Sequence, residues 1–294
     1  MANSWMARVA ELFFRLQPKR TEAWYHRHLS ALQDEPRPAT PPPRGVACRT
    51  EDGPGGRVFW LNEAGKGPCT VFYLHGGSYI HDFSYFHWRF LKQLIRRTDA
   101  VVSAPAYALA PWGTWREAFD LFLPLFTAYA AAHPERKLIL MGDSAGGGLA
   151  AAAALELQRT GQRLPDELIL LSPWMDVTIS DPDIRPFLAR DPWLTPAHRA
   201  CGSWWAGDLD LRDPRVSPAY GDWTGMRRVT VFAGTRDILN PDSVKLFSRL
   251  DPAGDNELVL SEGMFHVYPL LPVPEADRAL DRIVEIIRRE APKA

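Results

Sequence analysis

The chain has 294 residues, of which 46% are hydrophobic and 23% are charged, with a net charge of −1. This is the composition of a globular protein with one large core; the near-zero charge argues against a nucleic-acid partner, and no apolar run approaches the roughly 18 residues of a membrane span. The N-terminus lacks the unbroken apolar run of a secretory signal, and three scattered cysteines (Cys48, Cys69 and Cys201) form no disulfide framework, so we expect a cytoplasmic protein without stable membrane insertion.

Residues 1–45 are predicted to form two helices and a stiff connector. Apolar residues recur at helical spacing at Trp5, Val9, Leu12 and Leu16. They predict an amphipathic helix at residues 4–17, whose apolar face, with Trp5 and Phe13, we expect to pack onto the rest of the protein. Docking on a membrane surface is the alternative, which the weakly basic polar face disfavours. A second helix is predicted near residues 21–33, and the proline-rich segment 34–45 is predicted to be the connector.

From residue 46 onward, short apolar runs alternate with longer helical patterns. Strands are predicted at residues 57–61, 70–77, 100–107, 137–142, 168–173, 228–234 and 257–262. Helices are predicted at residues 86–97, 114–133, 145–160, 241–250 and 274–290. The alternation is typical of βαβ units, so residues 46–294 are predicted to form one α/β domain with a mostly parallel central sheet flanked by helices. Segment 176–227, rich in Pro, Asp and Trp, is predicted to leave the sheet.

The sequence Gly-Asp-Ser-Ala-Gly at residues 142–146 lies between a predicted strand and a predicted helix. It matches G-x-S-x-G, a sharp turn that exposes a nucleophilic serine and needs small residues because strand and helix approach closely. Ser144 would lie at a helix N-terminus, whose dipole favours a developing oxyanion. A glycine-rich phosphate loop is the alternative, but the motif G-x-x-x-x-G-K-[ST] is absent. We therefore predict that Ser144 is a nucleophile.

A second motif, His-Gly-Gly-Ser-Tyr at residues 75–79, ends an earlier predicted strand. Backbone N–H groups of such a loop, together with the N–H that follows the nucleophile, bind the oxyanion in serine hydrolases with this turn. The predicted oxyanion hole is therefore Gly76, Gly77 and Ala145. We expect His75 to order the loop rather than to transfer protons.

A nucleophilic serine needs a base, and the base needs a carboxylate that orients it. Two histidines follow the serine, His198 in the irregular segment and His266 after a predicted strand, and we predict His266 as the base. The acid should end the preceding strand, which places it at Asp237, with Asp242 as the second choice.

Several aromatic residues are candidates for an apolar substrate pocket, with packing inside a lid as the alternative. These candidates are Tyr79, Phe187, Trp193, Trp204 and Trp205. The remaining histidines, among them His26, His28, His81 and His87, match no metal-binding spacing, so we predict neither a metal nor a cofactor.

Taken in order, these motifs resemble the hormone-sensitive-lipase-like branch of α/β-hydrolase esterases. The resemblance rests on HGGSY, YALAP (107–111), GDSAGGGLA (142–150), LSPWMD (171–176), SPAY (217–220), Asp-x-Leu (237–239) and GMFHVY (263–268). It implies an α/β-hydrolase fold in which the N-terminal helices and segment 176–227 form a cap, and it suggests a homodimer. Two positions depart from the family pattern: Ser78 replaces the last glycine of HGGG, and YALAP-Trp112 replaces Y-R-L-A-P-E.

The family hydrolyses carboxylic esters of short to medium acyl chains without a cofactor, so the resemblance implies a serine carboxylesterase with a small-molecule ester substrate. The same triad permits hydrolysis of lactones or amides. A non-catalytic binder of the same fold is a further alternative, although such a binder is expected to lose the serine or the histidine.

Overall fold

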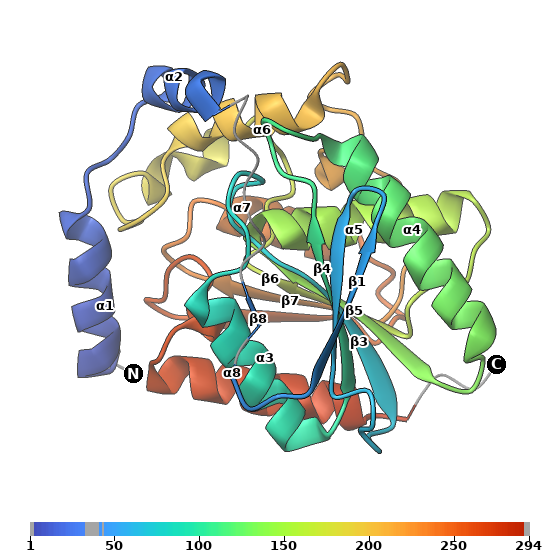
Figure 1. The fold of residues 1–294 in the computed structure, drawn as a ribbon. Coiled ribbons are helices and arrows are strands. Elements are labelled where there is room, and N and C mark those ends of the chain that lie inside the picture. The colour runs from blue at the N-terminus through green and yellow to red at the C-terminus, as the bar shows by residue number, and fades with distance from the viewer. Residues whose placement is uncertain (1–2, 33–40, 43, 291–294) are drawn as a thin grey trace.

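The protein is described here by a computed structural model that covers residues 3–32, 41–42 and 44–290. Its centre is an eight-stranded sheet with strand order β1-β2-β4-β3-β5-β6-β7-β8 (Figure 1). The strands are β1 Cys48–Gly53, β2 Gly56–Leu61, β3 Cys69–Leu74, β4 Val101–Tyr107, β5 Lys137–Asp143, β6 Glu167–Leu171, β7 Val229–Gly234 and β8 Glu257–Ser261. β2 pairs antiparallel with β1 and β4. The six strands β3 to β8 are parallel to one another, so their carboxyl ends meet at one edge of the sheet.

Helices cover both faces of the sheet, as Figure 1 shows. The helices of the sheet domain are α3 Tyr85–Thr98, α4 Trp115–Ala132, α5 Ser144–Arg159, α7 Asn240–Arg249 and α8 Pro274–Arg288. Helices α4, α5 and α7 share one hydrophobic cluster with the sheet, and α3 and α8 belong to the other. Strands β3, β5, β6 and β7 are buried along their whole length, which explains their continuous apolar sequences. The predicted α/β class with a mostly parallel sheet is confirmed.

Strand β1 was not predicted from the sequence, and its surroundings explain why. All six of its residues, Cys-Arg-Thr-Glu-Asp-Gly, are exposed, and the strand pairs only with β2 at the edge of the sheet. A strand that buries neither face carries no alternation of apolar and polar residues. Charged residues on such an edge also protect it from pairing with other chains.

A layer of helices lies over the carboxyl ends of the strands (Figure 1). It contains α1 Trp5–Leu16, α2 Glu22–Leu32 and α6 Arg199–Ala206, together with short 3₁₀ turns at Pro182–Phe187, Pro196–His198 and Pro218–Tyr220. We call α1, α2 and residues 176–227 the cap. Helix α2 packs on α6 and on the turn before it, so two parts of the chain far apart in sequence form one layer. The connector predicted at residues 34–45 lies mostly outside the described residues.

Helix α1 lies at the edge of the molecule, and the face that it packs against the protein is not the one predicted from the sequence. The expectation that its apolar face packs inward is wrong, because Trp5, Val9, Leu12, Phe13 and Leu16 are all exposed. The residues it buries are Ala7 and Phe14, on the opposite side of the helix. Periodicity identifies an apolar face but does not say what covers it. Among the described residues, no helix has the length and apolar character needed to cross a membrane.

Candidate active site

Three side chains from the ends of three strands form one hydrogen-bonded chain. Ser144 follows β5, Asp237 follows β7 and His266 follows β8, and all three are buried. His266 Nε2 lies 2.8 Å from Ser144 Oγ, and His266 Nδ1 lies 2.9 Å from Asp237 Oδ2. The carboxylate accepts a hydrogen bond from Nδ1–H, which leaves Nε2 free to accept a hydrogen bond from the serine hydroxyl. The structure thus brings together the three residues that the sequence analysis selected.

The turn that carries Ser144 is tight and strained. Ser144 has φ +51°, a left-handed conformation that costs a non-glycine residue free energy. A Cβ at Gly146 would lie 2.1 Å from the carbonyl oxygen of Leu74, and one at Gly142 would lie 2.3 Å from that of Gly146. Both flanking positions of the motif must therefore be glycine. This conformation places the serine hydroxyl at the cavity, between the strand and the helix N-terminus.

The backbone N–H groups beside Ser144 differ in part from the predicted oxyanion hole. The N–H of Gly76 donates to Asp143 Oδ1 at 2.9 Å, so it is already engaged. In the described part of the chain, no group accepts a hydrogen bond from the N–H of Gly77, Ser78 or Ala145. Gly77 and Ser78 line the cavity at Ser144. The structure therefore corrects the prediction at one position: Ser78, not Gly76, is the third available donor.

Asp143, the second residue of the Gly-Asp-Ser-Ala-Gly motif, is buried and contacts three other residues; the sequence analysis assigned it no role. Its carboxylate accepts hydrogen bonds from the Tyr73 hydroxyl at 2.6 Å and from the Gly76 N–H at 2.9 Å, and it lies 3.3 Å from His87 Nε2. Burial raises the pKa of Asp143, but His87 and these hydrogen bonds outweigh it and lower the pKa below its ordinary value. The ionised carboxylate thereby fixes the 75–79 loop against the nucleophile turn.

His75, as expected, belongs to the packing of this loop. Its Nδ1 lies 2.7 Å from the Gly76 carbonyl oxygen, and its ring stacks on Tyr107 at 4.4 Å between ring centres. Burial lowers the pKa of His75 to about 4, so the ring stays neutral near pH 7.

A third carboxylate, Asp191 of the cap, lies close to the Asp237–His266 pair. It is fully buried, and its carboxylate accepts hydrogen bonds from the backbone N–H groups of Trp193 at 2.8 Å, Leu194 at 2.9 Å and Ile238 at 2.9 Å. Asp191 therefore ties the cap to the residue next to Asp237. Burial and the charge of Asp237 raise the pKa of Asp191 to about 6. A single Asp in an irregular segment gives no sequence signal for this role.

The protonation of His266 depends on these carboxylates. Burial by itself lowers the pKa of a histidine, because it disfavours the charged ring. The negative charges of Asp237, Asp191 and Asp143 act in the opposite direction and outweigh burial, so the pKa of His266 is raised above its ordinary value. An imidazolium formed during a reaction is stabilised by the same charges.

A cavity of about 460 Å³ opens beside Ser144 and His266. Its apolar lining includes Phe14, Tyr25, Ile80, Phe86, Trp193, Leu194, Leu270 and Leu271. Trp193 stacks on Phe14 of α1 at 4.3 Å and contacts the His266 ring edge-on at 5.6 Å between ring centres. Of the five aromatic residues predicted for the pocket, Trp193 is the one that lines this cavity.

The other four predicted pocket residues lie elsewhere, and the structure corrects the prediction for them. Tyr79 and Trp205 are buried and stack on each other at 4.2 Å. The Trp204 indole N–H donates to His26 of α2 at 3.2 Å, and Phe187 packs against the hydrophobic core. Composition identifies apolar side chains but does not separate those that pack within the cap from those that line a cavity.

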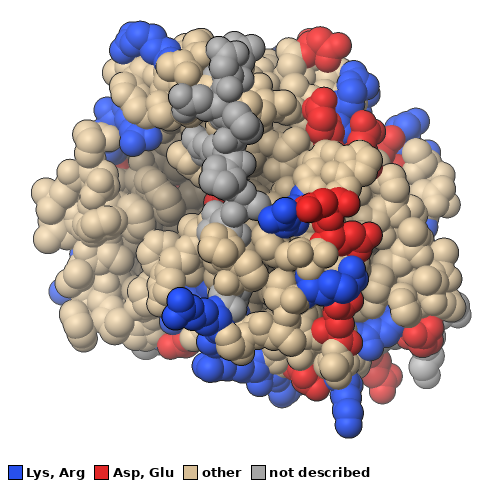
Figure 2. All heavy atoms as spheres, in the orientation of Figure 1, with Lys and Arg blue, Asp and Glu red and all other residues tan. Residues whose placement is uncertain are grey.

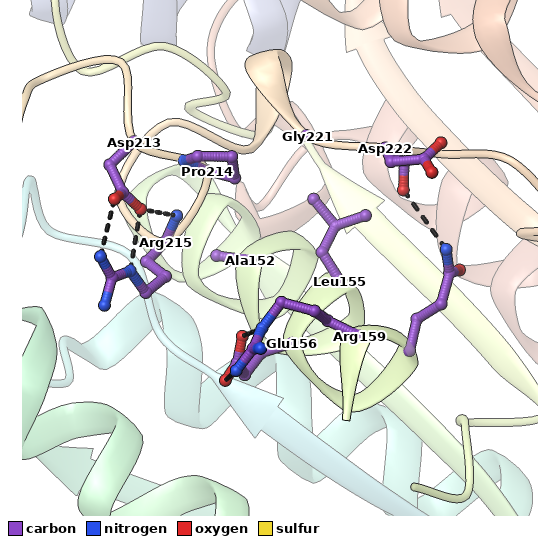
Figure 3. Close-up of a pocket in the computed structure, with 10 residues that line it drawn as sticks. Ala152, Leu155, Glu156, Arg159, Asp213, Pro214, Arg215, Gly221 and Asp222 are labelled. Atoms are coloured by element: carbon purple, nitrogen blue, oxygen red, sulfur yellow. Dashed lines mark hydrogen bonds and ion pairs between the residues drawn. The ribbon is translucent and has the colours of Figure 1, made fainter. Parts of the chain in front are cut away.

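A larger hollow, of about 630 Å³, lies between α5 and residues 213–222 (Figure 3). Figure 3 shows two ion pairs in its lining, Asp213 with Arg215 and Glu156 with Arg159. None of Ser144, Asp237 and His266 lines it. The chemistry of the cavity at Ser144, not the size of this hollow, decides where the candidate site lies.

Comparison with known proteins agrees with the geometry. A family model for the α/β-hydrolase fold matches residues 71–270. An esterase of Acinetobacter venetianus is 30% identical over 221 residues, which cover 73% of each chain; an acetyl-hydrolase of Streptomyces hygroscopicus is 30% identical over 230 residues, which cover 76% of each. The crystal structure of an esterase from the bacterial hormone-sensitive lipase family is 26% identical, with a TM-score of 0.80 over 98% of this chain and 99% of that one. The chain therefore belongs to the α/β-hydrolase family, in its hormone-sensitive-lipase-like branch, and is a carboxylic ester hydrolase.

Proposed function

We propose that the protein is a serine carboxylesterase that hydrolyses esters of short to medium acyl chains through a Ser144-His266-Asp237 triad. One observation carries the proposal: the hydrogen bonds of 2.8 Å and 2.9 Å that join the three side chains beside a cavity. Together with the esterase relatives, this geometry supports acyl transfer to a serine.

In the proposed mechanism, Ser144 Oγ attacks the ester carbonyl carbon while His266 Nε2 takes the hydroxyl proton. Asp237 holds the ring in the required tautomer and stabilises the imidazolium. The tetrahedral intermediate expels the alcohol, which receives the proton from His266, and an acyl-enzyme remains on Ser144. Water, activated by the same histidine, then attacks the acyl-enzyme and releases the acid.

The negative oxygen of the tetrahedral intermediate would be held by the N–H groups of Gly77, Ser78 and Ala145. These are backbone donors, so a serine in place of the family's glycine retains the donor at Ser78. Asp143 supports the arrangement indirectly, since its bond to the Gly76 N–H anchors the donor loop. Pre-organised donors of this kind need no rearrangement when the charge develops.

The size of the cavity leads to a prediction about acyl length. A volume of about 460 Å³, shared between the acyl and alcohol groups and walled by Trp193 and Phe14, suits short and medium chains. We expect kcat/KM for p-nitrophenyl acetate, butyrate and octanoate to exceed that for the palmitate by at least about tenfold. Steady-state hydrolysis of this ester series, measured with detergent held constant, tests the expectation.

The same series distinguishes the alternative substrates. Five- and six-membered lactones and p-nitroanilides of the same acyl groups are assayed beside the esters. A lactone or an anilide with a higher kcat/KM than every open-chain ester would replace the carboxylesterase assignment. An optimum at palmitate would contradict the proposed chain length while leaving the triad intact.

The charge around His266 predicts a pH profile. The base must be neutral to accept the serine proton, so activity is lost as pH falls through the pKa of His266. Because that pKa is raised above its ordinary value of about 6.5, we expect the acid limb of kcat/KM to have its midpoint above about pH 6.5. Asp191→Asn removes one of the charges that raise the pKa, so the midpoint should move to lower pH.

The measurement is kcat/KM for p-nitrophenyl acetate from about pH 5 to about pH 9, for the wild type, Asp191→Asn and the exposed control Asp183→Asn. The control is expected to keep the wild-type midpoint. A fall in kcat for Asp191→Asn without movement of the midpoint would show that Asp191 acts only by holding the cap. A wild-type midpoint well below pH 6.5 would contradict the assigned electrostatics.

A further inference from the structure

Helix α1 carries two apolar faces, of which the protein uses one. Its inner face buries Ala7 and Phe14. The opposite face exposes Trp5, Val9, Leu12, Phe13 and Leu16, whose exposed fractions lie between 56% and 74%. Successive members are one, three or four residues apart, so they form a continuous stripe along the helix. Single exposed apolar residues are common, but a stripe of five large ones marks an interaction surface.

Helix α1, which carries this stripe, is held in place by contacts along its whole length. At its start, the backbone N–H and the hydroxyl of Ser4 both donate to Glu275, at 2.7 and 2.8 Å. In its middle, Glu11 pairs with Arg236 through two bonds of 2.7 and 2.5 Å. Near its end, Phe14 stacks on Trp193. These contacts fix the rotation of α1, so the apolar stripe must face away from the protein.

The charges around the stripe are mainly positive. Residues 4–20 contain four basic side chains, Arg8, Arg15, Lys19 and Arg20, and one acidic side chain, Glu11. Glu11 is bound by Arg236 and also by Arg15, whose Nε donates to it at 2.8 Å, while Glu275 accepts hydrogen bonds from Ser4. Arg8 and Arg15 lie on the same border of the stripe and are exposed. Figure 2 shows the edge of the molecule formed by α1 largely free of Lys, Arg, Asp and Glu, so the outer face itself is uncharged.

The stripe also lies next to the cavity. Phe14, on the inner face of α1, and Gln17, Lys19 and Arg20, which follow the helix, line the cavity at Ser144. A surface that bound the outer face would therefore lie beside this cavity.

We propose that α1 is an interfacial anchor that lies on an anionic lipid surface, with its outer face in the boundary between headgroups and acyl chains. An exposed apolar stripe that contains Trp and is bordered by Arg is the pattern of helices that bind in this plane. Such a helix needs no membrane-spanning segment. Anionic headgroups complement Arg8, Lys19 and Arg20, together with the ion-paired group of Arg15, Glu11 and Arg236, which carries one net positive charge. Each positive charge adds attraction near an anionic surface. A second copy of the chain fits less well, because it would bring the same cations against each other.

The test is co-sedimentation of the full chain with vesicles of phosphatidylcholine alone or mixed with phosphatidylglycerol. We expect binding to the mixed vesicles that weakens with added salt. The double variant Leu12→Glu/Leu16→Glu should have a partition coefficient lower by about 100-fold or more, because two buried apolar side chains are lost. Val244→Glu/Leu260→Glu, which changes two exposed apolar residues elsewhere, is the matched control and should bind as the wild type does.

Activity and folding are measured separately from binding. All variants should retain the wild-type melting temperature and the wild-type rate with soluble p-nitrophenyl acetate, since none of these four residues lines the cavity. The proposal is overturned if the wild type binds neither kind of vesicle, or if the Leu12/Leu16 variant binds as well as the wild type. Equal binding to both kinds of vesicle would contradict the proposed preference for anionic lipid. A wild-type dimer that the variant converts to a monomer, without vesicle binding, would assign the stripe to self-association.

Discussion

Ser144→Ala is expected to lower kcat/KM for p-nitrophenyl acetate by on the order of 10⁵-fold to 10⁶-fold, the loss typical of removing a serine nucleophile. The hydroxyl that is removed lies 2.8 Å from the base, and the cavity offers no second hydroxyl in that position. Ser78 and Ser84 also line the cavity, but they belong to the donor loop and the start of α3, and neither is hydrogen-bonded to His266. Steady-state kinetics on purified wild type and variant measures the loss.

Two controls keep this result interpretable. Ser203→Ala, on the outer part of the cap, should leave both the rate and the melting temperature unchanged. A fluorophosphonate probe should form one adduct on the wild type, mapped to Ser144 by mass spectrometry, and none on Ser144→Ala. Near-full turnover by the alanine variant, or an adduct on another residue, would exclude Ser144 as the nucleophile. If the wild type formed no adduct at all, the non-catalytic binder would become the favoured alternative.

The residues that the sequence identified are those whose role follows from local backbone geometry and chain order. The turn around Ser144 needs Gly142 and Gly146 for steric reasons, and that need appears in the sequence as a motif. The order of nucleophile, acid and base then restricts the choice to a few positions after strands. Asp237 and His266 could therefore be selected before their distances from each other and from Ser144 were known.

What the sequence did not provide depends on contacts between distant segments. The assignment of Gly76 as a donor failed because its N–H is taken by Asp143, 67 positions later in the chain. Asp191 was overlooked because its partners, such as Ile238, become neighbours only when the cap folds over the strands. The outward direction of the α1 stripe was missed for the same reason: periodicity defines the stripe, but Glu11 and Ser4 decide which way it faces.

Asp237→Asn is expected to lower kcat by about 10⁴-fold, whereas Asp242→Asn, the second choice from the sequence, should leave kcat nearly unchanged. Asp237 uses both oxygens: Oδ2 faces His266 Nδ1 at 2.9 Å, and Oδ1 accepts the Leu239 N–H at 2.9 Å. An asparagine can satisfy only one of these donors with its carbonyl oxygen. If the oxygen stays on Leu239, the amide N–H points at Nδ1 and favours the tautomer with its proton on Nε2, which cannot accept the serine proton.

Asp242 gives the matched comparison, because it lies in the first turn of α7 and in a different environment. It borders a hollow with Asp176, Asp181 and Lys245, and burial together with the charges of the two other carboxylates raises its pKa to about 7. Replacing it with asparagine removes a carboxylate that repels its neighbours and leaves the Asp237–His266 bond intact. Both variants should melt near the wild-type temperature, so the comparison of kcat isolates the chemistry. A greater loss for Asp242→Asn than for Asp237→Asn would reverse the assignment of the acid, since only the true partner of His266 sets its tautomer.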